Sequence, residues 1–442
     1  MLMIEKQNQT RCSRLAQALV AVQVMGLLYY HIMEEIAMRK MVVVSLDAMF
    51  DQDLAALREG DFLHTWMKEA AICTQVKTVF PALTYPAHTT LVTGCDPCDH
   101  GIGQNQPFQP GKAAQMRAWY WDAAEVKRES LFDAVKHAGG RCASILWPVT
   151  GKHPSVRWGF TEVLALPGES QVLKMLRYGT PLWILRMELK HGKKRVSTRE
   201  PHLSDYATIL AEDLIRHQQP DLMAVHLVDL DEMRHHHGVD SPEAQEAMQR
   251  NQRRVERIWN AMQQTPGMED ALLVVLSDHG QANVSRTVNL TEQLRAAGLT
   301  GCAQVQSNGM SAYLFQHEQG EKGTAQAEAW LRAHGGDIGV KCVYDRQTLD
   351  RMGCIPQVAF AVEAAEDVVF SDGLPQAKRE KATHGFGPGH PAENCLLMIR
   401  GRGVKPTSLP VMPMRDVAPT LAGLMGVSLR EATGVDHSTQ MR

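Results

Sequence analysis

Short apolar runs alternate with longer segments of helical periodicity along most of this chain. Valine, leucine and isoleucine dominate the runs without strict alternation, which is typical of strands that are buried on both faces of a sheet. Helical periodicity appears between the runs, for example over residues 242–262 and 324–333. The runs are MVVVSL at 41–46, CASILW at 142–147, LMAVHLV at 222–228, ALLVVLS at 271–277, SAYLF at 311–315 and CLLMIR at 395–400. This pattern predicts an α/β fold, a three-layer α/β/α sandwich with a mostly parallel central sheet.

Two stretches interrupt the rhythm. Residues 148–204 carry prolines, glycines, tryptophans and a basic run at Lys193–Arg195, and residues 281–380 lack a strong strand run over long intervals. Functional groups of open α/β sheets collect at the carboxyl ends of the strands. We therefore interpret both stretches as cap insertions over that edge. They belong to one catalytic domain at residues 39–442 and are not independent domains.

The first 38 residues form an N-terminal extension before the first predicted strand. Leu15–Met33 contains no Asp, Glu, Lys or Arg over nineteen residues and follows two arginines, so it is long enough to cross a bilayer. Two glutamines and a histidine interrupt it, and no small-residue cleavage site follows. Three interpretations stand: a signal anchor, an amphipathic appendage, or sequence upstream of a start at Met38. The last favours a cytoplasmic protein, and the first a protein anchored in the membrane through residues 15–33.

Composition narrows the classes of partner. The chain has 442 residues, of which 44% are hydrophobic, and a formal net charge of -3, so no basic excess indicates bulk nucleic-acid binding. Nine scattered cysteines fit a reducing compartment better than a disulfide framework. Cys95 and Cys98 form a lone CxxC, which we interpret as an ordinary turn. The nineteen histidines are a first indication of metal chemistry.

Asp47 directly follows the apolar run at 41–46. A carboxylate at the end of a buried strand loses hydration, and this loss costs free energy unless a cation compensates for it. A bound metal ion would do so. A helix-capping aspartate is the alternative interpretation.

Thr84 lies in FPALTYPAHTTLVTG, just before Tyr85 and Pro86. Proline is tolerated only in the first turn of a helix, so the helix is predicted to begin near Thr84. The threonine hydroxyl would then lie at a helix N-terminus, where free backbone N–H groups attract anions. A plain N-cap threonine would explain the position alone.

Asp231 and His235 occur in VDLDEMRHHHG, after the buried run at 222–228. They are four residues apart, so one turn of helix would bring both side chains to one metal ion. Asp229, His236 and His237 are rivals within the same cluster.

Asp278 and His279 follow the apolar run at 271–277 and again place an oxygen and an imidazole at the end of a strand. His384 lies in the glycine- and proline-rich loop THGFGPGHP before the run at 395–400, with His390 as a second candidate. Oxygen and imidazole ligands without thiolate favour Zn²⁺, with Mn²⁺ or Fe as competitors.

In order and spacing these motifs resemble the alkaline phosphatase superfamily, in its nucleotide pyrophosphatase/phosphodiesterase (type I phosphodiesterase) branch. The run DVAPTLAGLMG at 416–426 resembles the closing helix of that superfamily, and the resemblance covers about residues 39–430. The residues that carry it are Asp47 in VVVSLDAM, Thr84 in FPALTYPAHTTLVTG, Asn105 in HGIGQN, Asp231 and His235 in DEMRHHHG, Asp278 and His279 in SDHG, and His384 in THGF.

The resemblance implies an alkaline-phosphatase-like sandwich with two divalent metal ions, Zn²⁺ in the relatives. Thr84 would be the nucleophile, through a covalent phospho-threonine. Asn105 would donate to a phosphate oxygen, and Tyr85 would flank the substrate pocket. One ion would be held by Asp231, His235 and His384, and the other by Asp47, Asp278, His279 and Thr84.

The implied function is hydrolysis of phosphodiester or phosphoanhydride (nucleotide pyrophosphate) bonds in a small-molecule phosphate ester or nucleotide. A phosphonoacetate-type phosphonate hydrolase or a phosphomonoesterase is the alternative at the same site. Basic cap residues would indicate it, and Lys152, Arg157 and Lys193 are the candidates. No arginine is placed as in the phosphomonoesterase branch, which favours singly charged diesters. The sequence leaves the oligomeric state open.

Overall fold

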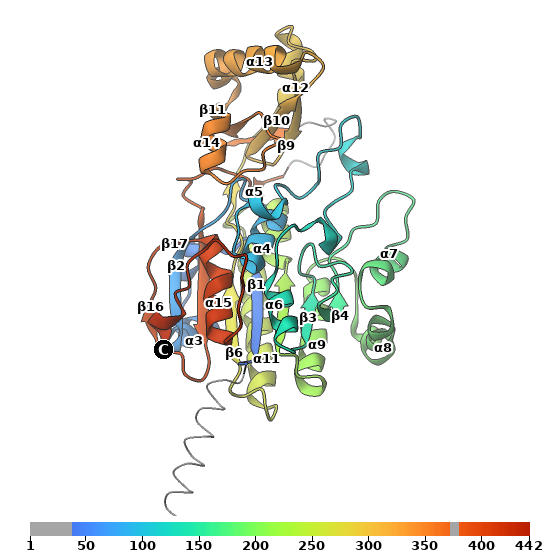
Figure 1. Cartoon of the computed structure of the whole chain (residues 1–442), viewed down its shortest axis with the longest axis vertical. Coiled ribbons are helices and arrows are strands. Elements are labelled where there is room, and N and C mark those ends of the chain that lie inside the picture. Colours follow the sequence, from blue (N-terminus) through green and yellow to red (C-terminus); the bar gives the residue numbers. More distant parts are fainter. Residues whose placement is uncertain (1–37, 372–379) are drawn as a thin grey trace, which may run out of the picture. The chain divides into compact units, whose positions relative to one another are not determined.

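Nine strands form the central sheet (Figure 1), in the order β16-β2-β15-β6-β1-β5-β3-β4 with β17 also paired to β2. This computed structural model describes residues 38–371 and 380–442, so residues 1–37 of the expected extension at 1–38, with its segment 15–33, lie outside the described residues. The strands are β1 (Met41–Leu46), β2 (Ala71–Lys77), β3 (Cys142–Ile145), β4 (Val156–Phe160), β5 (Leu222–Leu227), β6 (Leu272–Leu276), β15 (Asn394–Arg400), β16 (Thr407–Ser408) and β17 (Met412–Pro413).

The direction of the strands determines which loops meet. β1 pairs in parallel with β5 and β6, and β3 pairs in parallel with β4 and β5. β15 alone runs antiparallel to its neighbours β2 and β6. The segment that leads into β15 therefore lies at the edge where the parallel strands end. The predicted mostly parallel sheet is confirmed.

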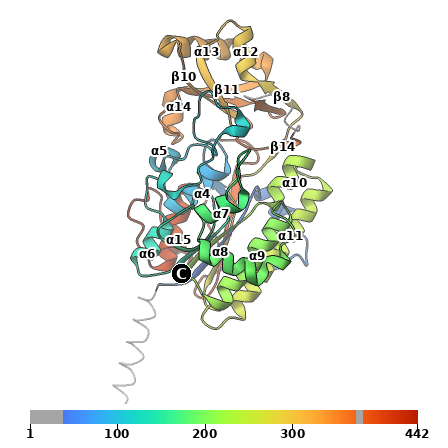
Figure 2. The ribbon, with the colours of Figure 1, turned by 90° about the vertical axis from the view of Figure 1, so that its right-hand side faces the viewer.

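Helices cover both faces of this sheet (Figure 2). One layer contains α4 (Thr84–Thr93), α6 (Leu131–His137) and α15 (Val417–Met425), which contact one another. The opposite layer contains α3 (Phe62–Trp66), α9 (His202–His217), α10 (Asp229–His237) and α11 (Pro242–Gln263). The three layers agree with the predicted sandwich. The remaining helices of the main body are α2 (Asp51–Ala55), α5 (Pro97–His100), α7 (Gln171–Tyr178) and α8 (Pro181–His191).

The core between β1 and the α9–α11 layer follows from the alternation of side chains along a strand and their helical repeat along a helix. Val42, Val44 and Leu46 alternate along β1 and share one face, which packs in the same cluster as Val255 and Ile258 of α11. Strands buried on both faces need no polar alternation, which is why the sequence shows near-continuous apolar runs.

A second sheet lies within residues 281–371. Its order is β11-β12-β10-β9, and all its pairings are antiparallel. The elements of this region are β8 (Arg286–Asn289), α12 (Leu290–Ala296), β9 (Ala303–Ser307), β10 (Ser311–Gln316), α13 (Gly320–His334), β11 (Val340–Tyr344), α14 (Arg346–Arg351), β12 (Phe360–Ala364) and β13 (Val368–Ser371). β8 pairs in parallel with β13, and β7 (Ala282–Asn283) pairs antiparallel with β14 (Ala382–Thr383).

The predicted strand SAYLF is β10, but it belongs to this second sheet. Ala312 and Leu314 pack in one apolar cluster, and Tyr313 and Phe315 pack in another on the opposite face. Burial on both faces removes the alternation that would distinguish β10 from a central strand. The edge strands of this sheet, β9 and β11, are half exposed and mixed in polarity, so neither forms an apolar run that could be recognised in the sequence.

The stretch at 148–204 contributes β4 to the edge of the central sheet and then forms α7 and α8. Within the described residues, no helix combines the length and apolar character needed to cross a membrane.

Arg254 of α11 holds the two helices beside β5 in place, and its loss is expected to destabilise the fold. It is 1% exposed, and its guanidinium donates to Asp229 at 2.6 Å and to Asp205 at 2.9 Å. Arg254→Met leaves Asp229 with less compensation, so the free energy of unfolding in urea should fall by about 3 kcal/mol or more. Arg257→Met is the matched control, because Arg257 is half exposed and pairs with Glu212, and it should cost less than about 1 kcal/mol. Equal losses in the two variants would contradict this assignment.

Candidate metal centre and nucleophile

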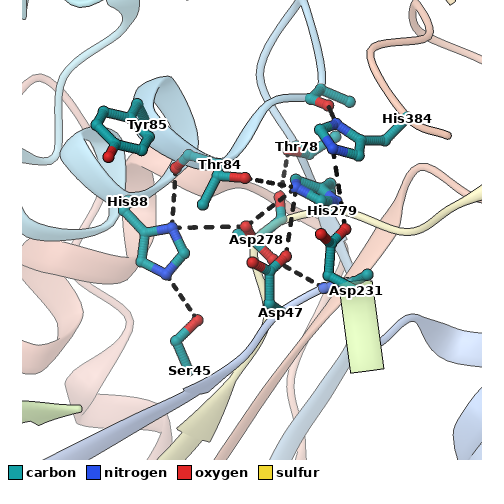
Figure 3. A network of polar contacts seen from close by, with 12 residues as sticks. Ser45, Asp47, Thr78, Thr84, Tyr85, His88, Asp231, Asp278, His279 and His384 are labelled. Atoms are coloured by element: carbon teal, nitrogen blue, oxygen red, sulfur yellow. Dashed lines mark hydrogen bonds and ion pairs between the residues drawn. The ribbon is translucent and has the colours of Figure 1, made fainter. Parts of the chain in front are cut away.

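Three neighbouring parallel strands deliver carboxylates to one edge of the central sheet. Asp47 follows the last residue of β1, Asp278 lies two residues after β6, and Asp231 lies in the first turn of α10 after β5. β1 is the middle strand of the three, so the ends of these strands are adjacent. Figure 3 shows these three side chains converging beneath His279, His384 and Thr84. The structure thus brings together all the predicted ligands: Asp47, Thr84, Asp231, His235, Asp278, His279 and His384.

Thr84 is the first residue of α4, as Pro86 in the first turn predicts. All ten residues of this helix are buried, and Thr84 itself is 7% exposed. Its Oγ1 lies 3.1 Å from Nε2 of His279. The hydroxyl therefore combines a helix N-terminus, which favours anions, with direct contact to the carboxylate and imidazole cluster.

Asp231, His235 and His384 form the first cluster, with one ligand atom of each within 4.8 Å of the others. Asp231 and His235 are one turn apart on α10, and their Oδ2 and Nε2 atoms are 3.4 Å apart. The Nδ1 atoms of His235 and His384 each lie 2.9 Å from a backbone carbonyl, of Ala382 and Ala82 respectively. A proton held on Nδ1 by the carbonyl leaves Nε2 free as a lone-pair ligand, which is the usual arrangement of metal-binding histidines.

The second cluster consists of Asp47, Asp278 and His279, and His279 joins it to the first. Its Nε2 lies 3.2 Å from Oδ2 of Asp278 and 3.5 Å from Oδ1 of Asp47. Its ring stacks on His384 at a centroid distance of 3.9 Å. Asp47, Asp231 and His279 also lie within 4.8 Å of one another, so the two clusters adjoin.

Two carboxylate oxygens show that this cluster fits a divalent cation. Oδ1 of Asp47 and Oδ2 of Asp278 are buried and have no hydrogen-bond partner within residues 38–371 and 380–442. Their sister oxygens are engaged, by His226 at 3.0 Å and by the N–H of Ala48 at 3.2 Å. A buried carboxylate oxygen without a partner is costly, and oxygen and imidazole donors are what Zn²⁺ and similar ions take.

The negative charge of the three buried carboxylates is not fully compensated by the neighbouring protein side chains. Burial, and then repulsion from Asp231, raises the pKa of Asp47 to about 7. Burial, and then repulsion from Asp47, raises the pKa of Asp278 well above its usual value. Burial also acts to raise the pKa of Asp231, but the nearby imidazoles of His235 and His384 outweigh it and hold that pKa below its usual value. Added positive charge would therefore stabilise the ionised cluster.

The turn after Asp47 is held by groups from two other elements. Ala48 has a φ of 62°, in the left-handed region that non-glycine residues avoid. Its N–H donates to Asp278, and its carbonyl accepts from Arg234. Arg234 lies between Asp231 and His235 on α10 and also pairs with Asp53. The backbone of one ligand is thereby fixed by the helix that carries two others.

Several residues that contact the ligands from behind carry little or no signal in the sequence. His226 of β5 contacts Asp47 through Nε2, and its Nδ1 lies 3.0 Å from Oε2 of Glu162. His88 of α4 contacts the carbonyl of Thr84 at 2.8 Å and the hydroxyl of Ser45 at 2.9 Å. An imidazole inside the apolar run LMAVHLV was the available signal for His226. Glu162 had none, because it follows an edge strand far away in sequence.

Asn105 and Tyr85 lie side by side near Thr84. Oδ1 of Asn105 accepts from the N–H of Tyr85 at 3.0 Å. The Tyr85 ring is fully buried against Trp119, and its hydroxyl donates to Glu162 at 3.3 Å. The substrate contacts of both residues stay predictions.

The rival ligands have other partners. Asp229 pairs with Arg250 and Arg254 of α11. His237 lies 3.5 Å from Glu243, and His390 stacks on Phe386. His236 is exposed on α10. The cluster VDLDEMRHHHG therefore contributes Asp231 and His235 to the site, as its helical spacing predicted.

Comparisons with known proteins identify a family to which the chain is similar. The family model described as type I phosphodiesterase / nucleotide pyrophosphatase matches residues 41–363. The ectonucleotide pyrophosphatase/phosphodiesterase family member 1 of Homo sapiens is 22% identical over 261 residues, which cover 53% of this chain and 24% of the relative. Venom phosphodiesterase 2 of Crotalus adamanteus is 20% identical over 224 residues, which cover 48% of this chain and 23% of the relative. The matched segment thus spans about a quarter of the length of these curated relatives.

Solved structures agree on the fold. Murine ectonucleotide pyrophosphatase / phosphodiesterase 5 superposes with a TM-score of 0.67 at 18% identity, covering 90% of this chain and 97% of that one. The human protein gives 0.64 at 20% identity with the same coverage. An inactive threonine-to-alanine variant of the murine protein has been solved in complex with AMP. The predicted alkaline-phosphatase-like fold is confirmed.

Chelation should reveal the charge imbalance as a pH-dependent loss of stability. The pKa of Asp47 is raised from 3.8 to about 7 in the folded protein, so the folded state binds the extra proton and metal-free stability should fall as pH rises from about 4 to about 7. Asp47→Asn removes this ionisation. After chelation, the free energy of unfolding of Asp47→Asn minus that of wild type, measured by thermal denaturation, should increase by about 2–3 kcal/mol from pH 5 to pH 8. Asp270→Asn, at an exposed residue paired with Arg402, is the control and should show no such gain. A constant difference between Asp47→Asn and wild type across this window would contradict the account.

Proposed function

The chain belongs to the type I phosphodiesterase / nucleotide pyrophosphatase family, and on this premise we propose that it is a metal-dependent hydrolase of phosphodiester or phosphoanhydride bonds in nucleotides and similar small molecules. The observation that carries the proposal is the position of Thr84. Its hydroxyl begins a buried helix and lies 3.1 Å from His279, within a cluster of three carboxylates and three imidazoles.

The ligand sets divide between two divalent ions, which we propose to be Zn²⁺. Asp231, His235 and His384 would hold one, and Asp47, Asp278, His279 and Thr84 would hold the other. Bound ions of this kind lower the pKa of a coordinated hydroxyl and offset the negative charge of a phosphate group.

Thr84 supplies the nucleophile. Its Oγ1 gives up its proton to solvent and attacks phosphorus in line, so a Thr84 Oγ1–P bond forms while the bond to the leaving oxygen breaks, and that oxygen departs with the bonding electrons and takes up a proton from solvent. Water then attacks phosphorus and the Thr84 Oγ1–P bond breaks, so the water oxygen stays on the released phosphate product and one water proton restores the Thr84 hydroxyl. The buried contacts of His88 to the carbonyl of Thr84 keep the first turn of α4 in place during both steps.

Neutral donors face the developing charge. The N–H of Tyr85 is engaged by Asn105, which fixes the side-chain amide beside Thr84 and leaves its Nδ2 donors for a phosphate oxygen. Pro86 has no N–H, so the backbone N–H of Thr84 is the other donor that the first turn offers.

The cap cations support a diester over a doubly charged substrate. Nζ of Lys152 lies 2.5 Å from Asp122, and the guanidinium of Arg157 lies 5.2 Å from the ring centroid of Trp158. Lys193 is exposed on the segment after α8. Each of these candidates for a phosphonate hydrolase or phosphomonoesterase thus lies among neighbours other than the predicted ligands. The AMP bound to the murine relative favours a nucleotide as the substrate class.

Replacement of the nucleophile should separate chemistry from metal binding. Thr84→Ala removes the attacking oxygen but leaves six ligands, so turnover of bis-p-nitrophenyl phosphate should fall about 10³-fold or more while metal content measured by mass spectrometry is kept. Thr84→Ser retains a hydroxyl and should stay within about tenfold of wild type. Full turnover by Thr84→Ala would refute the mechanism.

A substrate panel tests the bond that is cleaved. With zinc added, the p-nitrophenyl diester should be hydrolysed with a higher kcat/KM than the p-nitrophenyl monoester, because one negative charge needs less compensation at this site. A strong preference for the monoester would replace the proposal with the phosphomonoesterase alternative.

A further inference from the structure

Helix α8 is apolar on two opposite faces. Trp183, Ile184 and Met187 point inward and belong to the main core cluster. Leu182, Leu185 and Leu189 occupy the opposite face at spacings of three and four residues, and Leu182 and Leu189 are 82% and 91% exposed. A solvated helix normally places polar residues on its outer face, so this leucine stripe has no role in the fold.

Further apolar side chains extend the stripe. α7 contacts α8, and its Val172 and Leu173 are exposed. Val196, after α8, is 76% exposed. Figure 1 shows α7 and α8 together at one side of the molecule. We call the surface formed by the exposed residues of 171–199 the α7–α8 patch.

The patch is strongly basic in a chain whose net charge is -3. Residues 171–199 contain eight Lys or Arg and one acidic residue, Glu188. Glu188 is paired with Arg195, and Lys190 is paired with Asp213. Arg186, Lys193, Lys194 and Arg199 form no ion pair within the described part of the chain, so their charge is available to an outside partner.

We propose that the α7–α8 patch docks on an anionic lipid surface. Projecting leucines and valines can enter the boundary between headgroups and acyl chains, while neighbouring cations contact anionic headgroups. The proposal concerns a surface remote in sequence from the ligands and does not depend on the proposed hydrolysis.

The positive charge of the α7–α8 patch argues against a second copy of the chain as its partner. A second copy of the chain would bring two basic patches together, which repels. An anionic bilayer can accommodate both the exposed apolar side chains and the cations of the patch.

Vesicle co-sedimentation of the full chain tests the proposal. The probes are vesicles of phosphatidylcholine with about one third phosphatidylglycerol, and vesicles of phosphatidylcholine alone. Wild type should bind the anionic vesicles, and binding should weaken with added salt. Lys193→Gln/Lys194→Gln should lower affinity about twenty- to thirtyfold, and Leu182→Gln/Leu189→Gln at least about tenfold.

The control variants remove the same charge, or two exposed apolar side chains, elsewhere on the chain. Lys68→Gln/Lys322→Gln changes two exposed lysines, and Val411→Gln/Val435→Gln changes two exposed valines, both outside the patch. These variants should bind like wild type, and all four should keep the melting temperature of wild type.

The remaining outcomes overturn the proposal. Equal binding to neutral vesicles, or binding unchanged in both patch variants, would assign membrane contact to another part of the chain. A dimer in light scattering that Leu182→Gln/Leu189→Gln dissociates, without vesicle binding, would assign the patch to a second copy. Absence of binding to either vesicle would refute the lipid surface directly.

Discussion

The burial of three carboxylates at one point is the constraint on which this site depends. Asp47, Asp231 and Asp278 come from the ends of three adjacent strands and lie almost out of contact with solvent. The imidazoles around them compensate Asp231 more than Asp47 and Asp278, whose pKa values are raised by burial and by mutual repulsion. Such a cluster is stable as an ionised set only with additional positive charge. The same charge would attract a phosphate group to the Thr84 hydroxyl, so structural compensation and catalysis would share one cause.

Strand direction makes this convergence possible. The parallel strands β6, β1 and β5 bring their carboxyl ends to one edge, and Thr84 follows β2. His384 precedes β15, which is antiparallel, so it arrives at that edge from the opposite direction. A parallel β15 would have placed His384 at the far edge of the sheet. The clustering of ligands separated by more than three hundred residues is thus a property of topology.

The sequence predicted the fold and most of the individual ligands because both rest on local signals. Buried strands appear in the sequence as apolar runs, and Asp47 and Asp278 directly follow such runs. Pro86 fixed the start of α4, and the four-residue spacing of Asp231 and His235 fixed their common helix face. The supporting residues were hidden, since the contact between Glu162 and His226 depends on how an edge strand packs. The apolar run of β10 resembles that of a central strand because both of its faces are buried, although β10 belongs to the second sheet.

Anomalous diffraction at the zinc absorption edge, from crystals of the protein equilibrated with zinc, tests the central claim most directly. Two anomalous peaks are expected. One should be surrounded by Asp231, His235 and His384, and the other by Asp47, Asp278, His279 and the oxygen of Thr84. No peak at these side chains, or a single peak that leaves Asp47 and Asp278 without a cation, would contradict it.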